Sequence, residues 1–207
     1  MMLYKYFSGV VLAFILWYLM FVVKPIENFW IMMVISTSLL SVISITTNRK
    51  QLSFENFNYK EILIGLFSAV ILYLVFFAGK NLLDVLKIIP NHQQNISNVY
   101  ASRGMLPAWT IALFLFFPVG FGEEIFWRGY LQRMFSEKYG NTKSFLLTTF
   151  FYTAIHIPTL NPVLILAAFL VGIYWGLIFI WRKNNIVAPM VSHMVWDPVI
   201  FIILPFS

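Results

Sequence analysis

The sequence of 207 residues contains no cysteine and little charge. Without cysteine the chain forms no disulfide and carries no thiol nucleophile, iron–sulfur cluster or cysteine-based zinc site. Charged residues make up only 11% of the chain and hydrophobic residues 60%, whereas an ordinary soluble domain is about 25% charged. A soluble domain of this size cannot bury so much apolar surface. Disordered chains have a low content of hydrophobic residues, so disorder is excluded as well. The composition therefore indicates one integral membrane domain.

Long uncharged stretches predict an all-α bundle of about seven transmembrane helices, with six or eight as alternatives. Each span needs roughly 20 apolar residues. Residues 80–103 are predicted as one long polar loop, and residues 51–60 as a polar stretch at the membrane surface. The predicted spans are 6–23, 28–48, 62–79, the stretch 104–122 that runs directly into two acids, two helices within 144–181 that prolines separate, and 184–207.

Basic residues are distributed unevenly over the predicted loops. Cytoplasmic loops carry an excess of lysine and arginine, so this distribution predicts a cytoplasmic N-terminus. We attribute the net charge of +6 to this topology and to attraction by lipid headgroups, and we expect no nucleic-acid partner. The residues predicted to be cytoplasmic are Lys5, Arg49, Lys50, Lys60, Arg133, Lys138, Lys143, Arg182 and Lys183, and those on the other side are Lys24, Lys80, Lys87 and Arg103.

The first candidate site is the sequence from Glu123 to Arg128. An ionisable group inside a membrane span is costly unless it is paired or hydrated, so each one is a functional hypothesis. Glu124 precedes Arg128 by four residues, which favours an ion pair on one helix face. Glu123 is turned away by about 100° and is predicted to remain available as a general base. The alternative is that both acids form a solvated helix end.

The second candidate is His156, with Tyr152 one turn earlier on the same helix face. Tyr152 is expected to hydrogen-bond or orient the imidazole. The alternative is that this histidine only joins two helices.

The third candidate is the pair His193 and Asp197, which share one face of the last helix because they are four residues apart. The carboxylate can fix the tautomer of the histidine, or both groups can act on one oxygen or one metal ion. Pro189 and Pro198 flank the pair and are predicted to kink the helix. The alternative is a pair that only holds helices together.

These groups are expected to form one polar cluster, because buried charges must find partners. A water between Glu123 and His156, with His193 and Asp197 opposite, would give a base and oxyanion donors on two sides of a scissile carbonyl. The cluster therefore predicts peptide hydrolysis within the membrane.

The combination of these motifs resembles the type II CAAX prenyl protease family, also called the CPBP or Abi family of intramembrane proteases. The matching motifs are Glu123-Glu124-x-x-x-Arg128, an aromatic-x-x-x-His ending at His156, and His193-x-x-x-Asp197. They lie between about residue 106 and the C-terminus. We therefore expect a single membrane domain, 1–207, in which 1–103 are family-variable spans and 104–207 form the catalytic core.

The resemblance implies that Glu123 and His156 activate the attacking water. It implies that His193 and Asp197 stabilise the oxyanion.

The same resemblance implies that Glu124 and Arg128 brace the site. The family usually has Phe where this chain has Tyr152, and commonly Asn where it has Asp197. An ionised aspartate cannot donate a hydrogen bond to an oxyanion. Asp197 is therefore expected to be protonated, to orient His193, or to bind a metal ion.

Zinc remains an open alternative at this stage. Glu123, His156, His193 and Asp197 together have the chemistry of a four-coordinate zinc site. We favour a metal-free glutamate mechanism, because the sequence has no His-Glu-x-x-His pair and the ligands would come from three separate helices.

The leading functional expectation is an intramembrane endopeptidase in a bacterial plasma membrane, with its active site toward the cytoplasmic side. Its substrates would be membrane-associated peptides or proteins, lipidated or amphipathic, in CAAX-type processing or in bacteriocin maturation and self-immunity. One alternative is a non-proteolytic bacteriocin-immunity or partner-binding membrane protein. Another is a proton-coupled transporter, which the lack of an inverted repeat disfavours. No role is expected for His92.

Overall fold

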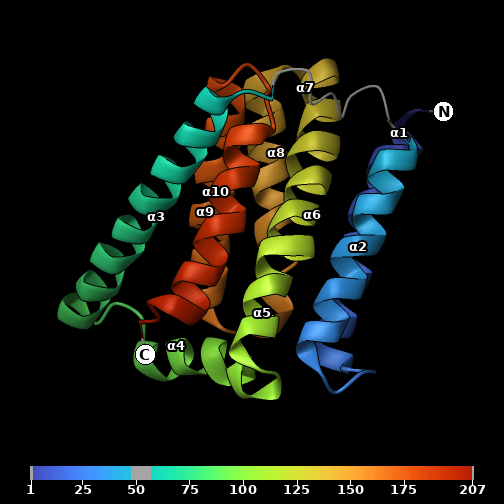
Figure 1. Ribbon diagram of the computed structural model, residues 1–207. Coiled ribbons are helices and arrows are strands. Elements are labelled where there is room, and N and C mark those ends of the chain that lie inside the picture. The colour runs from blue at the N-terminus through green and yellow to red at the C-terminus, as the bar shows by residue number, and fades with distance from the viewer. Residues whose placement is uncertain (1, 48–56, 207) are drawn as a thin grey trace.

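The chain folds into one bundle of helices, with α4 lying across its lower end (Figure 1). The computed structural model describes residues 2–47 and 57–206, and every regular element within them is helical, which confirms the predicted all-α class. Arg49, Lys50 and residues 51–56 of the predicted polar stretch lie outside the described residues. The helices are α1 (Met2–Tyr18), α2 (Phe29–Thr47), α3 (Tyr59–Leu86), α4 (His92–Tyr100), α5 (Ala108–Phe114), α6 (Phe121–Glu124), α7 (Arg133–Tyr139), α8 (Asn141–Ala154), α9 (Pro162–Trp181) and α10 (Val187–Pro198).

Four helical stretches are long and apolar enough to cross a membrane, and with the composition they identify an integral membrane protein. Two shorter apolar helices, Phe7–Val23 and Val187–Ile203, accompany them. Helix α8 has 14 residues and begins with a polar turn. The expected number of seven spans therefore stays a prediction. The four long stretches are Phe29–Thr47, Tyr59–Leu86, Ala108–Tyr139 and Pro162–Trp181.

Residues 80–103 are largely helical, so the prediction of one long polar loop is wrong. Helix α3 continues to Leu86 and α4 follows it. Lys80 Nζ lies 3.2 Å from Asp84 Oδ2 one turn along α3, and Asp84 Oδ1 lies 2.8 Å from His92 Nε2 in α4. The charges of this segment are satisfied locally, which permits helix where composition suggested loop. His92 thereby joins α4 to α3.

The stretch that begins in the predicted span 104–122 continues as a broken helix from Ala108 to Tyr139. Its backbone is extended at Phe117 (φ −152°, ψ 119°), directly before Pro118, because a residue that precedes proline avoids the helical region. Beyond this break, α6 carries Glu123 and Glu124 in the middle of the stretch, and both side chains are buried. The alternative of a solvated helix end is therefore wrong.

The prolines of the last helix have different effects. Pro189 lies in the first turn of α10, where it costs no internal hydrogen bond. Pro198 ends the regular part of the helix, which continues as a π-helical turn over Val199–Ile203. The predicted distortion is thus confined to the Pro198 end.

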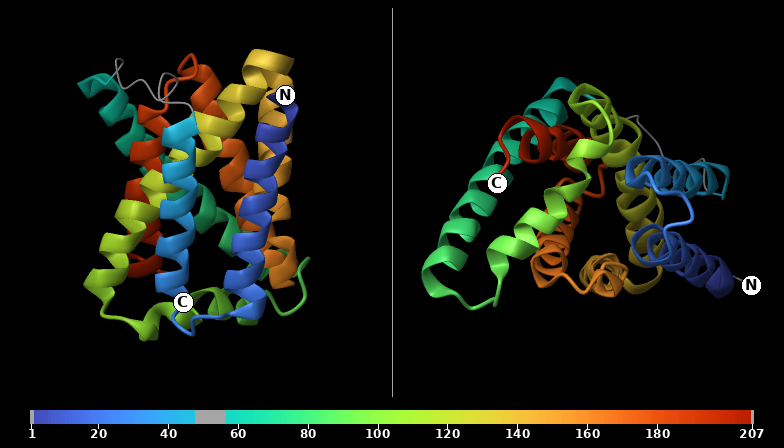
Figure 2. Two further views of the ribbon diagram at one scale, coloured as in Figure 1. Left: turned by 90° about the vertical axis from the view of Figure 1, so that its right-hand side faces the viewer. Right: turned by 90° about the horizontal axis from the view of Figure 1, so that it is seen from below.

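The two ends of the bundle are here called the N-terminal face and the C-terminal face. The N-terminus lies at the N-terminal face, where α3, α8 and α10 also begin; the C-terminus lies at the C-terminal face, where α2, α5 and α9 begin and α4 crosses (Figures 1 and 2). Exposed Trp181 ends α9 at one face, and exposed Trp109 begins α5 at the other. Tryptophan at both ends of a span is typical of the membrane interface.

Candidate active site

One cavity connects the middle of the bundle with the C-terminal face. Its volume is about 580 Å³. The outer part is lined by residues of α4 and of the connection between α1 and α2. The inner part is lined by side chains from α6, α8, α10 and the turn after α8, which are Glu123, Tyr152, His156, His193 and Asp197. The four predicted catalytic residues therefore share one cavity, as the convergence of buried charges requires.

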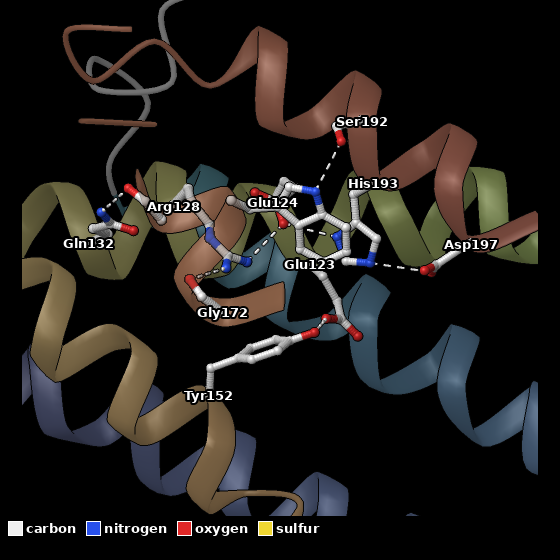
Figure 3. Close-up of polar contacts among 11 residues, drawn as sticks. Glu123, Glu124, Arg128, Gln132, Tyr152, Gly172, Ser192, His193 and Asp197 are labelled. Carbon is white, nitrogen blue, oxygen red and sulfur yellow. Dashed lines mark hydrogen bonds and ion pairs between the residues drawn. The ribbon is translucent and has the colours of Figure 1, made fainter. Parts of the chain in front are cut away.

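Glu123 is held by a hydroxyl group from a neighbouring helix. The Tyr152 hydroxyl donates a hydrogen bond of 2.9 Å to Glu123 Oε2 (Figure 3). The Glu123 side chain is only 4% exposed. Arg128 forms its ion pair with the neighbouring Glu124. The hydrogen bond from Tyr152 engages one carboxylate oxygen of Glu123, so the other can accept a proton from a bound water.

Glu124 is at the centre of a fully buried charge cluster. Its Oε1 lies 2.8 Å from Arg128 Nη1 and 2.9 Å from His193 Nδ1 (Figure 3). Arg128 Nη2 also donates to the Gly172 carbonyl oxygen at 3.3 Å. The predicted ion pair between Glu124 and Arg128 is therefore confirmed, and it fastens α6 to α9 and α10.

His193 lies between two carboxylates. Its Nε2 is 3.2 Å from Asp197 Oδ2 on the opposite side of the ring from Glu124. The Trp175 ring stacks on the imidazole, with centroids 3.7 Å apart and planes inclined by 19°. Trp175 is itself fixed, because its Nε1 donates to Ser192 Oγ at 3.1 Å. These contacts leave His193 one orientation, with Nε2 and Asp197 toward the cavity.

His156 follows the end of α8 and is fixed by two hydrogen bonds. Its Nδ1 lies 2.8 Å from the Tyr152 carbonyl oxygen, and its Nε2 accepts from Trp17 Nε1 at 3.3 Å. Tyr152 thus orients the imidazole through its backbone carbonyl, while its hydroxyl donates a hydrogen bond to Glu123. The two contacts require the neutral tautomer that carries the proton on Nδ1.

Sequence reasoning missed Trp17 and Trp175, both of which are fully buried and contact a site histidine. The one signal in the sequence for these contacts is that a buried indole N–H usually needs a hydrogen-bond acceptor. The chain has seven tryptophans, and nothing in their spacing distinguishes these two from the others.

The site residues do not fit a metal centre. In the part of the chain that the structure describes, no group of three His, Asp or Glu side chains is placed to hold a metal ion. His156 directs its two nitrogens to Trp17 and to a backbone carbonyl, and His193 directs its two nitrogens to carboxylates. Zinc would need these nitrogens as free ligands.

Two groups outside the spans close the bundle at its faces. At the C-terminal face, the Tyr100 hydroxyl donates to the Ile200 carbonyl oxygen at 3.0 Å, and burial raises the pKa of this phenol, so the donor stays protonated. At the N-terminal face, Arg182 Nη2 lies 2.6 Å from Glu61 Oε1. This hydrogen bond raises the pKa of the Arg182 guanidinium, which stays charged. The pair ties α3 to α9.

Comparison with known proteins matches the segment that carries the site. A family model described as type II CAAX prenyl endopeptidase Rce1-like matches residues 105–199. This segment includes α5 to α10 and all seven predicted site residues, so the resemblance inferred from the motifs is confirmed. No curated protein and no solved structure shows a significant match to the chain.

Proposed function

We propose, from the match of residues 105–199 to the Rce1-like family model of type II CAAX prenyl endopeptidases, that this integral membrane protein hydrolyses peptide bonds in the cavity between α6, α8 and α10. The match supports a CAAX-type protease in general terms. The single observation that carries the mechanism is that the two adjacent acids have different surroundings. Glu123 faces the cavity, while Glu124 is held by Arg128 and His193.

Glu123 is the proposed general base. Its carboxylate accepts a proton from a water molecule, whose oxygen then attacks the carbonyl carbon of the peptide. The resulting tetrahedral intermediate collapses when Glu123 returns this proton to the leaving amine nitrogen. Water and peptide thereby give one carboxylate product and one amine product, and Glu123 is regenerated.

His156 is proposed to position the attacking water. Its hydrogen bond from Trp17 is 3.3 Å long, which exceeds the usual 2.9–3.0 Å for such a bond. The Nε2 lone pair is therefore only weakly used. A water in the cavity can share it while it contacts Glu123.

His193 is proposed to stabilise the oxyanion. Both of its nitrogens face carboxylate oxygens, and donation from both is the pattern of a positively charged imidazolium. Its Nε2, 3.2 Å from Asp197 Oδ2, lies on the cavity side, so the charged ring is placed to stabilise the negative charge that develops there in the intermediate. Asp197 then orients and neutralises His193 rather than donating to the oxyanion itself, which accounts for aspartate at a position where the family commonly has asparagine.

The cavity walls favour a peptide with apolar side chains. Aromatic residues from α1, α2, α3 and α10 surround the entrance to the polar cluster, among them Phe29, Phe76 and Trp196. Membrane-associated, lipidated or amphipathic segments are the corresponding substrate class. A bacterial plasma membrane and a role in bacteriocin maturation or self-immunity remain part of the proposal.

The test is cleavage of a panel of apolar and prenylated peptides by the protein in lipid nanodiscs. We expect Glu123→Gln to lower cleavage by about 10²–10⁴-fold, the usual contribution of a general base. The matched control is Glu137→Gln, because Glu137 is exposed and does not line the cavity. Loss of activity on adding a chelator would contradict the metal-free mechanism. Absence of cleavage, together with a cellular function that survives Glu123→Gln, would favour the partner-binding alternative.

A further inference from the structure

The distribution of basic residues separates the two faces of the bundle. At the C-terminal face there are only a few of them. The excess of lysine and arginine marks the cytoplasmic side of a membrane protein. The basic residues at the N-terminal face, by helix position among the described residues, are Lys5, Lys60, Arg133, Lys138, Lys143, Arg182 and Lys183, and those at the C-terminal face are Lys24, Lys80, Lys87 and Arg103.

The cavity opens at the face with fewer basic residues. Lys24 and Glu27 line its mouth from the connection between α1 and α2, and Asn98 lines it from α4. Leu160 lines it from the turn before α9 and is 84% exposed. Figures 1 and 2 show α4 and the C-terminus at this same face. Among the described residues, none that lines the cavity lies in the last turn of α7 or of α9, and these two helix ends mark the other face.

The sequence predicts both a cytoplasmic N-terminus and an active site toward the cytoplasmic side. The two predictions conflict, because the cavity opens at the face opposite the N-terminus (Figure 1). The route from the cytoplasm is closed in the described structure by packed polar and charged side chains. Arg128 and Gln132 occupy the side of the site nearer the N-terminal face, both with about 1% exposure. They donate to the backbone carbonyls of Gly172 and Gly176 in α9. Neither side chain lines the cavity, which therefore ends before it reaches the N-terminal face.

We infer that the active site receives its substrates from the non-cytoplasmic side of the membrane. This inference rests on the proposed protease function for its chemistry. The substrate class is then an exported peptide, or the non-cytoplasmic part of a membrane protein, whose apolar segment enters between α4 and the connection between α1 and α2. The mouth offers the exposed side-chain amide of Asn98, which suits an extended peptide backbone.

The absence of cysteine makes the test free of background. Single cysteines are introduced as Asn98→Cys at the cavity mouth and Thr142→Cys at the start of α8 on the N-terminal face; both native side chains are exposed and uncharged. Intact spheroplasts of a bacterial expression host are treated with a membrane-impermeant maleimide, before or after lysis. We expect Asn98→Cys to be labelled in intact spheroplasts and Thr142→Cys only after lysis. The reverse pattern, or labelling of both in intact spheroplasts, would overturn the inference.

A third position reports on the cavity itself. Ala167→Cys places a thiol on the cavity wall in α9, where a small charged methanethiosulfonate is expected to modify it from outside intact spheroplasts. Modification only after lysis would contradict entry from the non-cytoplasmic side. The labelling needs no catalysis, so a failure of the protease proposal appears separately as correct labelling without cleavage of externally added peptide.

Discussion

At the scale of residues, the site depends on how neighbouring polar side chains are assigned different partners. Glu123 receives a hydroxyl hydrogen bond from Tyr152, whereas Glu124 receives a guanidinium and an imidazole. A buried carboxylate with strong cationic partners is a poor base, because these partners stabilise its ionised form. The adjacent carboxylate with one neutral donor keeps an oxygen for chemistry.

Tyr152→Phe is expected to keep the fold and weaken the site. The change removes the donor to Glu123 Oε2, and a hydrogen bond to a charged group contributes about 1.5–3 kcal/mol. We expect a loss of stability within that range and a fall in cleavage of about tenfold, since about 1.4 kcal/mol corresponds to a factor of ten. The measurement is cleavage rate per folded molecule together with detergent-induced unfolding.

The control for Tyr152→Phe is Tyr174→Phe. The Tyr174 hydroxyl donates to the Ser68 carbonyl oxygen at 2.8 Å, away from the polar cluster. This variant should lose about 0.5–1.5 kcal/mol of stability and keep its cleavage rate. Equal losses of activity in the two variants would show that Tyr152 has no particular role at Glu123.

At the scale of elements, the first helix is part of the site although it lies outside the family match. Trp17 from α1 reaches His156 through its indole N–H. The hydrogen bond fixes the proton of His156 on Nδ1, and it holds the ring against the cavity. Helices before residue 105 therefore complete a site whose proposed catalytic residues all lie within 105–199.

Replacing Trp17 by 3-benzothienylalanine removes only the N–H and keeps the shape of the ring. We expect cleavage to fall by about 3-fold to 10-fold, which corresponds to one hydrogen bond of 0.5–1.5 kcal/mol. We also expect a change in the tautomer of His156, measured by ¹⁵N NMR of the imidazole. The same replacement at Trp127 is the control, because Trp127 is fully buried and its Nε1 has no hydrogen-bond partner in the described structure. A loss of activity of equal size at Trp127 would refute the positioning role.

The contact between α2 and α6 positions Glu123 through a glycine. A Cβ atom on Gly122 would lie 2.6 Å from Ser41 Oγ and 3.3 Å from the Thr37 carbonyl oxygen. The two helices therefore pack closely directly beside Glu123, the proposed general base. Only glycine permits this approach without a shift of α6.

Gly122→Ala is expected to cost about 1–3 kcal/mol of stability, the usual cost of overpacking, and to reduce cleavage by displacing Glu123. Adding Ser41→Ala should restore part of both, because it removes the nearest atom. Gly79→Ala in α3 is the control, since a Cβ atom there meets nothing within 4 Å, and it should be neutral or stabilising. Thermal unfolding and peptide cleavage of these three variants decide whether the close contact matters; no rescue by Ser41→Ala would argue against it.

At the scale of the whole molecule, composition and charge spacing predicted the helical class, the membrane location and most helix positions. The ion pair of Glu124 and Arg128 was predictable because helical spacing alone brings the groups together. Three features were not: the helix over residues 92–100, which depends on the contact of His92 with Asp84; the roles of Trp17 and Trp175, which are tertiary; and the direction in which the cavity opens. These depend on side-chain packing between segments far apart in sequence, for which single-sequence patterns carry no signal.

The most direct test of the central claim compares Glu123→Gln with Glu124→Gln in the same measurement, the rate of peptide cleavage per folded molecule in nanodiscs. Glu124→Gln leaves Arg128 buried without its counter-charge, and breaking such a pair costs about 3–5 kcal/mol. We predict that Glu123→Gln folds with near-normal stability and does not cleave, while the folded fraction of Glu124→Gln is small and retains measurable cleavage. A stable, cleaving Glu123→Gln variant would contradict the account.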